Sequence, residues 1–184
     1  MTRLTDVLQQ YDESVDAVAN STYNFYQGNL ARLFSLIDET PEFRAVVGKL
    51  EALNDFDAWY DDLTTRGRSH GLGAPQLNLP SDRDAALAMQ ISLFRKMAKG
   101  TIQPVLFAHQ YISSNKNANE NVRELSRQLF YPMTRGLRRH LVNAIPPPPK
   151  ELVSFKLEKW GMGIDMKELW RRGWSLVNRR KNKK

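Results

Sequence analysis

The stretch 134–140, TRGLRRH, brings three arginines and a histidine together within seven residues. Guanidinium groups bind phosphate oxygens through paired N–H donors, and histidine exchanges a proton near neutral pH. Arg135 and Arg139 are four residues apart and share a helix face, with Arg138 beside it, and like charges at this spacing repel. An anion would therefore stabilise this patch: either a nucleic-acid phosphate or a carboxylate from the acidic N-terminal part of the chain.

The same stretch contains an Arg-x4-His pattern formed by Arg135 and His140. It resembles the signature of ribonucleases with the HEPN fold, helical domains often found in toxin and antiviral systems. In that family the two residues lie at the scissile phosphate, usually paired across a dimer. The resemblance implies a metal-independent ribonuclease in which His140 is the general acid–base and Arg135 stabilises charge. Gly136 follows the arginine here, where the family often has a polar residue.

A second basic surface is predicted in residues 150–184. Along 166–177 the apolar residues, among them Leu169, Trp170 and Trp174, fall on one face of a helix, and the chain ends in RRKNKK. A basic amphipathic helix of this kind binds nucleic-acid phosphates or anionic lipid, or docks its apolar face on protein. The candidate nucleic-acid-binding residues in this arm are Arg171, Arg172, Trp174, Arg179, Arg180, Lys181, Lys183 and Lys184.

Charge is distributed unevenly along the chain, whose net charge is +7. Residues 1–62 carry a net charge of −8, residues 63–149 of +8 and residues 150–184 of +7. If the first two parts fold together, their charges can pair across the contact. The excess then lies in the arm, which predicts an anionic partner outside the chain.

Other kinds of site have less support in the sequence. The chain has no cysteine, which excludes disulfides and thiolate chemistry. Asp55, Asp57, Asp61 and Asp62 could attract a hard cation, but they lack an EF-hand spacing and are expected to form a solvated face. We therefore expect no metal and no cofactor. The first residues carry no apolar segment of the secretory type, so a cytoplasmic location is expected.

The elements that must position these residues are predicted to be helices throughout. Apolar residues recur every three or four positions over 4–37, which predicts one long N-terminal helix. A helix capped by Ser81 is expected to extend to about Lys99, and its segment AALAMQISLF (85–94) is apolar on most sides, which favours a central position. A further helix over 122–145 is expected to be interrupted at Pro132.

The four prolines at 146–149 indicate a boundary, because consecutive prolines form a stiff spacer without N–H donors. The predicted organisation is an all-α helical bundle over 1–145, a polyproline spacer over 146–149 and a basic amphipathic arm over 150–184.

Three functions are compatible with these features. The first is a non-specific nucleic-acid-binding accessory or architectural protein that uses both basic patches. The second is the HEPN-like ribonuclease. The third is a helical interaction protein that forms a homodimer through its first helix, or whose arm docks on an acidic partner or an anionic membrane surface. The sequence leaves the choice between DNA and RNA open.

Overall fold

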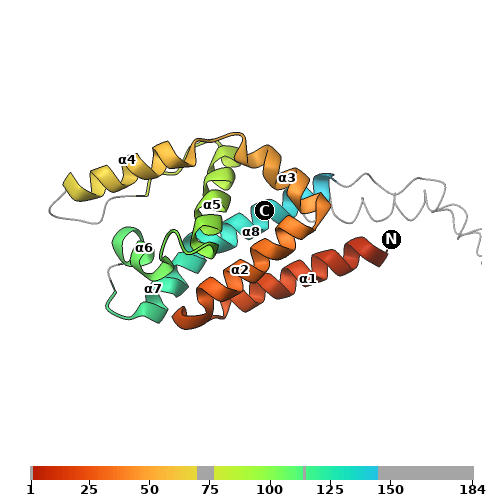
Figure 1. Cartoon of the computed structure of the whole chain (residues 1–184), viewed down its shortest axis with the longest axis horizontal. Coiled ribbons are helices and arrows are strands. Elements are labelled where there is room, and N and C mark those ends of the chain that lie inside the picture. The colour runs from red at the N-terminus through yellow and green to blue at the C-terminus, as the bar shows by residue number, and fades with distance from the viewer. Residues whose placement is uncertain (1, 70–76, 114, 145–184) are drawn as a thin grey trace, which may run out of the picture. The chain divides into compact units, whose positions relative to one another are not determined.

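A computed structural model describes residues 2–69, 77–113 and 115–144, and every regular element within them is a helix (Figure 1). The predicted all-α bundle is therefore confirmed. The predictions for the spacer and the arm, residues 146–184, lie outside the described residues. The elements are α1 (Thr2–Ala19), α2 (Tyr23–Glu39), α3 (Pro41–Glu51), α4 (Phe56–Ser69), α5 (Arg83–Ala98), α6 (Pro104–Tyr111), α7 (Ala118–Leu125), a π-helical turn (Ser126–Phe130) and α8 (Tyr131–Ala144).

The prediction of one long N-terminal helix is wrong, because α1 and α2 form an antiparallel hairpin. Polar side chains satisfy the carbonyls that the end of α1 leaves free. Ser21 Oγ donates to the carbonyl oxygen of Ala17 at 2.6 Å, and Asn29 Nδ2 donates to the same oxygen from α2 at 3.1 Å. Apolar residues recur every three or four positions across the turn as well, because each of the two helices buries one face with that spacing. The periodicity alone therefore could not reveal the break.

Helix α5 is the centre of the bundle, as its sequence predicted. It packs against α2, α3, α4 and α8, and most of its apolar residues are fully buried. Its N-terminal cap is Asp82, whose Oδ1 accepts hydrogen bonds from the backbone N–H groups of Asp84 at 3.1 Å and Ala85 at 2.8 Å. The prediction that Ser81 is the cap was thus wrong by one residue. Either oxygen can cap a helix, and the observed backbone places the aspartate in the capping position.

The chain does not break at Pro132, which lies in the first turn of α8 after a π-helical turn. In that turn the N–H of Tyr131 donates to the carbonyl oxygen of Ser126, five residues back. Proline has no N–H of its own, and the wider turn precedes the point where a regular helix would be disturbed. One extra residue in a turn also rotates the following side chains by about 100° around the axis. The π-helical turn therefore helps to set which face of α8 meets α5.

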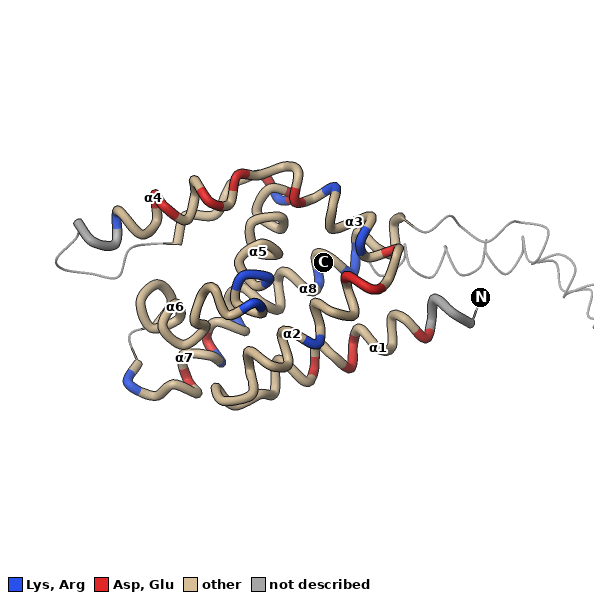
Figure 2. Tube along the Cα trace, in the orientation of Figure 1, with Lys and Arg blue, Asp and Glu red and all other residues tan. Residues whose placement is uncertain are grey.

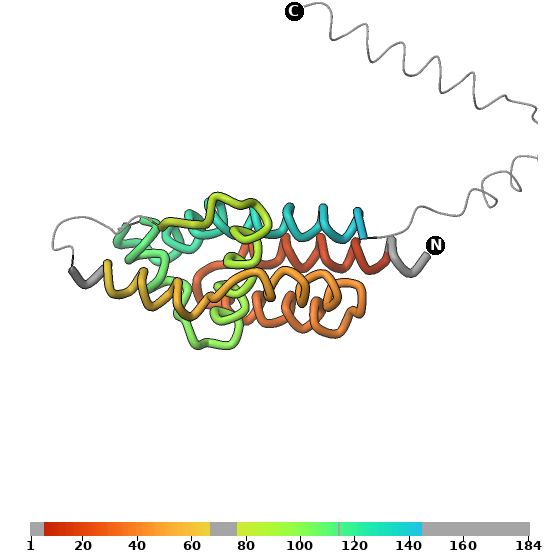
Figure 3. Tube along the Cα trace, turned by 90° about the horizontal axis from the view of Figure 1, so that it is seen from above, coloured from red at the N-terminus to blue at the C-terminus, as the bar shows by residue number. Residues whose placement is uncertain are grey.

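Helix α8 lies beside α1 as well (Figure 3). The buried hydroxyl of Tyr11 in α1 donates to the carbonyl oxygen of Thr134 at 3.1 Å. This contact leaves the opposite side of α8 facing α5 and α3. Among the described helices, none combines the length and apolar character needed to cross a bilayer.

Candidate functional site

Acidic and basic parts of the bundle pair across helix contacts, as their opposite net charges predicted. Figure 2 shows acidic segments along α1 and α4 and basic ones on α5 and α8. Arg95 of α5 lies 2.9 Å from a carboxylate oxygen of Asp38 and 3.0 Å from one of Glu51. Lys96 Nζ lies 2.6 Å from Asp57 Oδ1. These contacts use much of the basic charge of α5 within the fold.

Arg138 is paired in the same way. Its Nε and Nη2 lie 3.2 and 3.3 Å from the two carboxylate oxygens of Asp12 in α1. Both side chains are about half exposed, so the pair contributes little to stability, about 0.2–1 kcal/mol. Of the two partners that the sequence allowed for Arg138, a phosphate or an N-terminal carboxylate, the structure supplies the carboxylate.

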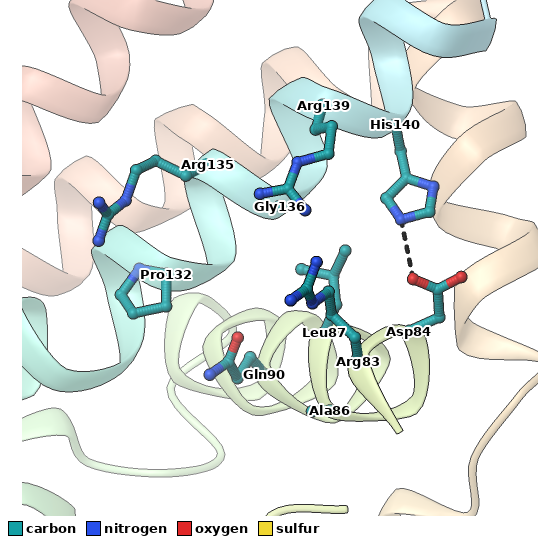
Figure 4. Close-up of a pocket in the computed structure, with 10 residues that line it drawn as sticks. All are labelled: Arg83, Asp84, Ala86, Leu87, Gln90, Pro132, Arg135, Gly136, Arg139 and His140. Carbon is teal, nitrogen blue, oxygen red and sulfur yellow. Dashed lines mark hydrogen bonds and ion pairs between the residues drawn. The ribbon is translucent and has the colours of Figure 1, made fainter. Parts of the chain in front are cut away.

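The other side of α8 forms a groove with α5, and its volume is about 380 Å³ (Figure 4). Arg83 comes from α5, and Arg135 and Arg139 come from α8. Within the described residues, none of these three guanidinium groups pairs with a carboxylate; Arg135 Nε donates instead to the backbone oxygen of Tyr131 at 3.3 Å. The groove is lined by Arg83, Asp84, Ala86, Leu87, Gln90, Pro132, Arg135, Gly136, Arg139 and His140.

The two helices run in opposite directions along the groove, which fixes the order of its residues. Arg83 and Arg139 reach toward the same space from opposite walls, while Arg135 lies beside Pro132 at one end (Figure 4). His140 lies at the other end, where its Nε2 is 3.1 Å from Asp84 Oδ1. The groove therefore contains both residues of the Arg-x4-His pattern, but at opposite ends.

Gly136 allows the helices to approach closely at the middle of the groove. A Cβ atom at this position would lie 2.9 Å from Leu87 Cδ1 and 3.2 Å from Leu87 Cδ2. Real Cβ atoms almost never come within 3.0 Å of another heavy atom, so a larger residue would force Leu87 to move. The absence of a polar side chain after Arg135 thus has a packing reason.

The floor of the groove carries one polar side chain without a partner. Gln90 is only 7% exposed, and it makes no hydrogen bond to any other described residue. Its amide lies between α5 and α8, below Pro132, and faces the groove (Figure 4). The amide nitrogen and oxygen are both open to the groove, so water or a ligand can reach them.

Sequence analysis found Arg135, Arg139 and His140 but missed Arg83 and Gln90. A signal was present, since residues 83, 86, 87 and 90 have the spacing of one helix face. Arg83 and Gln90 are the polar residues of that face, and they mark the part of it that the neighbouring helix leaves open. Which neighbour would line it could not be known before the packing of α8.

The acidic cluster in α4 and just before it is used by the fold. Asp55 Oδ1 accepts a hydrogen bond from the N–H of Ala58, and Asp62 forms an ion pair with Arg66 one turn later. Within the described ranges no three histidine or carboxylate side chains gather closely enough to hold a metal ion. The eight candidate residues of the C-terminal arm lie outside those ranges.

No protein-family model, no curated protein and no solved structure matches this chain. The resemblance to HEPN ribonucleases accordingly extends over residues 135–140 and no further. Evidence for a function therefore comes from the residues that line the groove.

Proposed function

We propose that this chain is a cytoplasmic accessory protein that binds the phosphate backbone of nucleic acid non-specifically, through the groove between α5 and α8. One observation carries the proposal: Arg83, Arg135 and Arg139 line one groove without a carboxylate partner among the described residues. The neighbouring arginines Arg95 and Arg138 have such partners. The fold thus leaves unpaired the arginines that share a concave surface.

The physical reason is electrostatic. Three guanidinium groups around one groove repel one another, and phosphate oxygens would relieve that repulsion through charge-assisted hydrogen bonds. Each phosphate neutralised also releases condensed counterions from the nucleic acid. The logarithm of the binding constant then falls with the logarithm of salt concentration, with a slope of about −0.7 per contacted phosphate of a single strand.

The adjacent residues Arg138 and Arg139 provide a matched test in the full-length chain. Arg139→Gln removes a groove charge, whereas Arg138→Gln removes an equal charge that is already paired with Asp12. Fluorescence anisotropy with a labelled single strand, measured from about 50 to 200 mM salt, gives the slope for each variant. We expect Arg139→Gln to reduce the slope by about 0.7 and Arg138→Gln to change it much less. Equal effects of the two variants, or a wild-type slope near zero, would contradict the proposal.

The arm of residues 150–184 is proposed as a second contact, on the strength of its sequence. Neutralising the arm should also lower the magnitude of the salt slope, by about 0.7 for each phosphate contact of a single strand that is lost. The residues to replace together are Arg179, Arg180, Lys181, Lys183 and Lys184. An unchanged slope would remove the arm from the nucleic-acid interface. Flotation of the full-length chain with anionic vesicles would then test the membrane alternative.

A HEPN-like ribonuclease is the second candidate, because Arg135 and His140 line the same groove and Asp84 holds His140 by its Nε2. A carboxylate beside an imidazole holds it in one orientation, which suits a general acid–base. Cleavage of a labelled RNA should then be lost in His140→Ala and reduced in Asp84→Asn. Identical RNA profiles for the wild type and His140→Ala would exclude this candidate and leave the binding function untouched.

A further inference from the structure

We infer that the groove seats one unpaired nucleotide of a single strand, with its base at Gln90 and its flanking phosphates at the arginines. The inference rests on the proposed nucleic-acid function and narrows it from any phosphate backbone to single-stranded nucleic acid. Four observations carry it: an unpartnered amide that faces the groove, apolar atoms beside that amide, arginines on both sides of it along the groove, and the volume of the groove.

The amide of Gln90 indicates a base rather than a phosphate. Its NH₂ group donates and its carbonyl oxygen accepts, and neither has a partner among the described residues. A phosphodiester has acceptor oxygens only, so it can satisfy the NH₂ group and leaves the carbonyl oxygen unpaired. A nucleobase edge presents donors and acceptors together, as in the pairing of glutamine with adenine.

The apolar atoms next to Gln90 suit contact with one face of a planar ring. Ala86 and Leu87 come from α5, and Pro132 and Gly136 come from α8. Pro132 is partly exposed beside the amide (Figure 4), and Gly136 presents no side chain. The volume of about 380 Å³ lies within the range of roughly 300–1,000 Å³ that small-ligand sites occupy.

The arginines lie on both sides of Gln90 along the groove. Arg83 is seven residues before Gln90, about 10 Å along the axis of α5, and Arg139 faces it from α8. Arg135 lies at the opposite end beside Pro132. A strand that follows the groove therefore meets positive charge on both sides of the base position. In a duplex the bases are stacked and paired, and one could reach Gln90 only by leaving the stack.

The experiment uses the full chain and three ligands with the same number of phosphates: a mixed-sequence single strand, the same strand with abasic sites throughout, and a duplex of half that length. At constant salt we expect the abasic strand to bind at least about 5-fold more weakly than the intact strand. The duplex should also bind more weakly per phosphate. Gln90→Leu, an apolar side chain of similar size, should reduce the intact-to-abasic ratio below about 2-fold and leave the salt slope unchanged. Arg138→Gln should keep the wild-type ratio.

The outcomes separate this inference from the function on which it rests. Equal binding of intact and abasic strands by the wild type, with a steep salt slope, would overturn the inference and leave backbone binding standing. The inference is also overturned if Gln90→Leu keeps the wild-type ratio of intact-strand to abasic-strand affinity. Absence of salt-dependent binding to all three ligands would overturn the proposed function itself. The strand comparison on the wild type does not depend on how any variant folds.

Discussion

Replacing Gly136 by alanine tests whether the close contact of α8 with Leu87 sets the groove. Alanine in place of glycine inside a helix stabilises it by about 1 kcal/mol. Here the new Cβ would lie 2.9 Å from Leu87 Cδ1, and Leu87 is only 5% exposed. Pushing Leu87 off its rotamer costs about 0.5–1.5 kcal/mol, and overpacking costs about 1–3 kcal/mol if the backbone must follow. We therefore expect Gly136→Ala to change the free energy of unfolding by between about 0.5 kcal/mol of stabilisation and about 2 kcal/mol of destabilisation.

Gly28 and Gly48 are matched controls, because both are exposed in helices and an added Cβ meets nothing within 4 Å. Gly28→Ala and Gly48→Ala should each stabilise the chain by about 0.5–1 kcal/mol. Urea denaturation followed by circular dichroism measures the change in the free energy of unfolding. The difference between Gly136→Ala and either control should be at least about 0.5 kcal/mol, or roughly 1–2 °C in Tm. If Gly136→Ala stabilises as much as the controls do, α5 and α8 have room to spare and the packing argument is wrong.

Three further predictions concern the bundle. Gly100 has φ of +75°, and a Cβ there would lie 2.7 Å from Gln27 Nε2. Gly100→Ala should therefore lower the free energy of unfolding by about 1–2 kcal/mol, whereas Gly28→Ala and Gly48→Ala raise it. Burial raises the pKa of the Tyr11 and Tyr26 phenols well above the ordinary value of 10.0, so the stability they contribute is complete below pH 10 and is lost as the pH rises further. Ionisation of the two phenols in the unfolded chain should lower the free energy of unfolding by about 3 kcal/mol at pH 11. The variant with both Tyr11→Phe and Tyr26→Phe should therefore show a flatter decline of the urea midpoint between pH 9 and 11. Phe94, fully buried in α5, should destabilise by about 3–5 kcal/mol when replaced by alanine, and a loss below 1 kcal/mol would place it outside the core.

Much of the architecture followed from the sequence because local patterns report burial directly. The apolar residues on most sides of α5 predicted its central place in the bundle. The hairpin of α1 and α2 was missed because side-chain periodicity records which positions are buried and not the direction of the chain. Pro132 was taken as a break because the rule for proline assumes regular helical hydrogen bonds, and a π-helical turn precedes it.

For the candidate site, spacing alone placed Arg135 and Arg139 on one face and identified Arg138 as a neighbour. It could not tell which face of α8 would meet α1, so Arg138 and Arg139 were equivalent candidates. In the fold Arg138 pairs with Asp12, while Arg139 enters the groove. Gly136 looked like a departure from a catalytic pattern, and it is the point where Leu87 packs against α8.

The sequence by itself determined that this chain forms helices, where its apolar stripes lie and how unevenly its charge is distributed, because these depend on residues close together along the chain. Only the tertiary structure decided which charges are neutralised and which remain unpaired. That outcome depends on which helix faces meet, and packing brings Arg83 and Gln90 of α5 opposite Arg135 and Arg139 of α8, some 45 or more residues away.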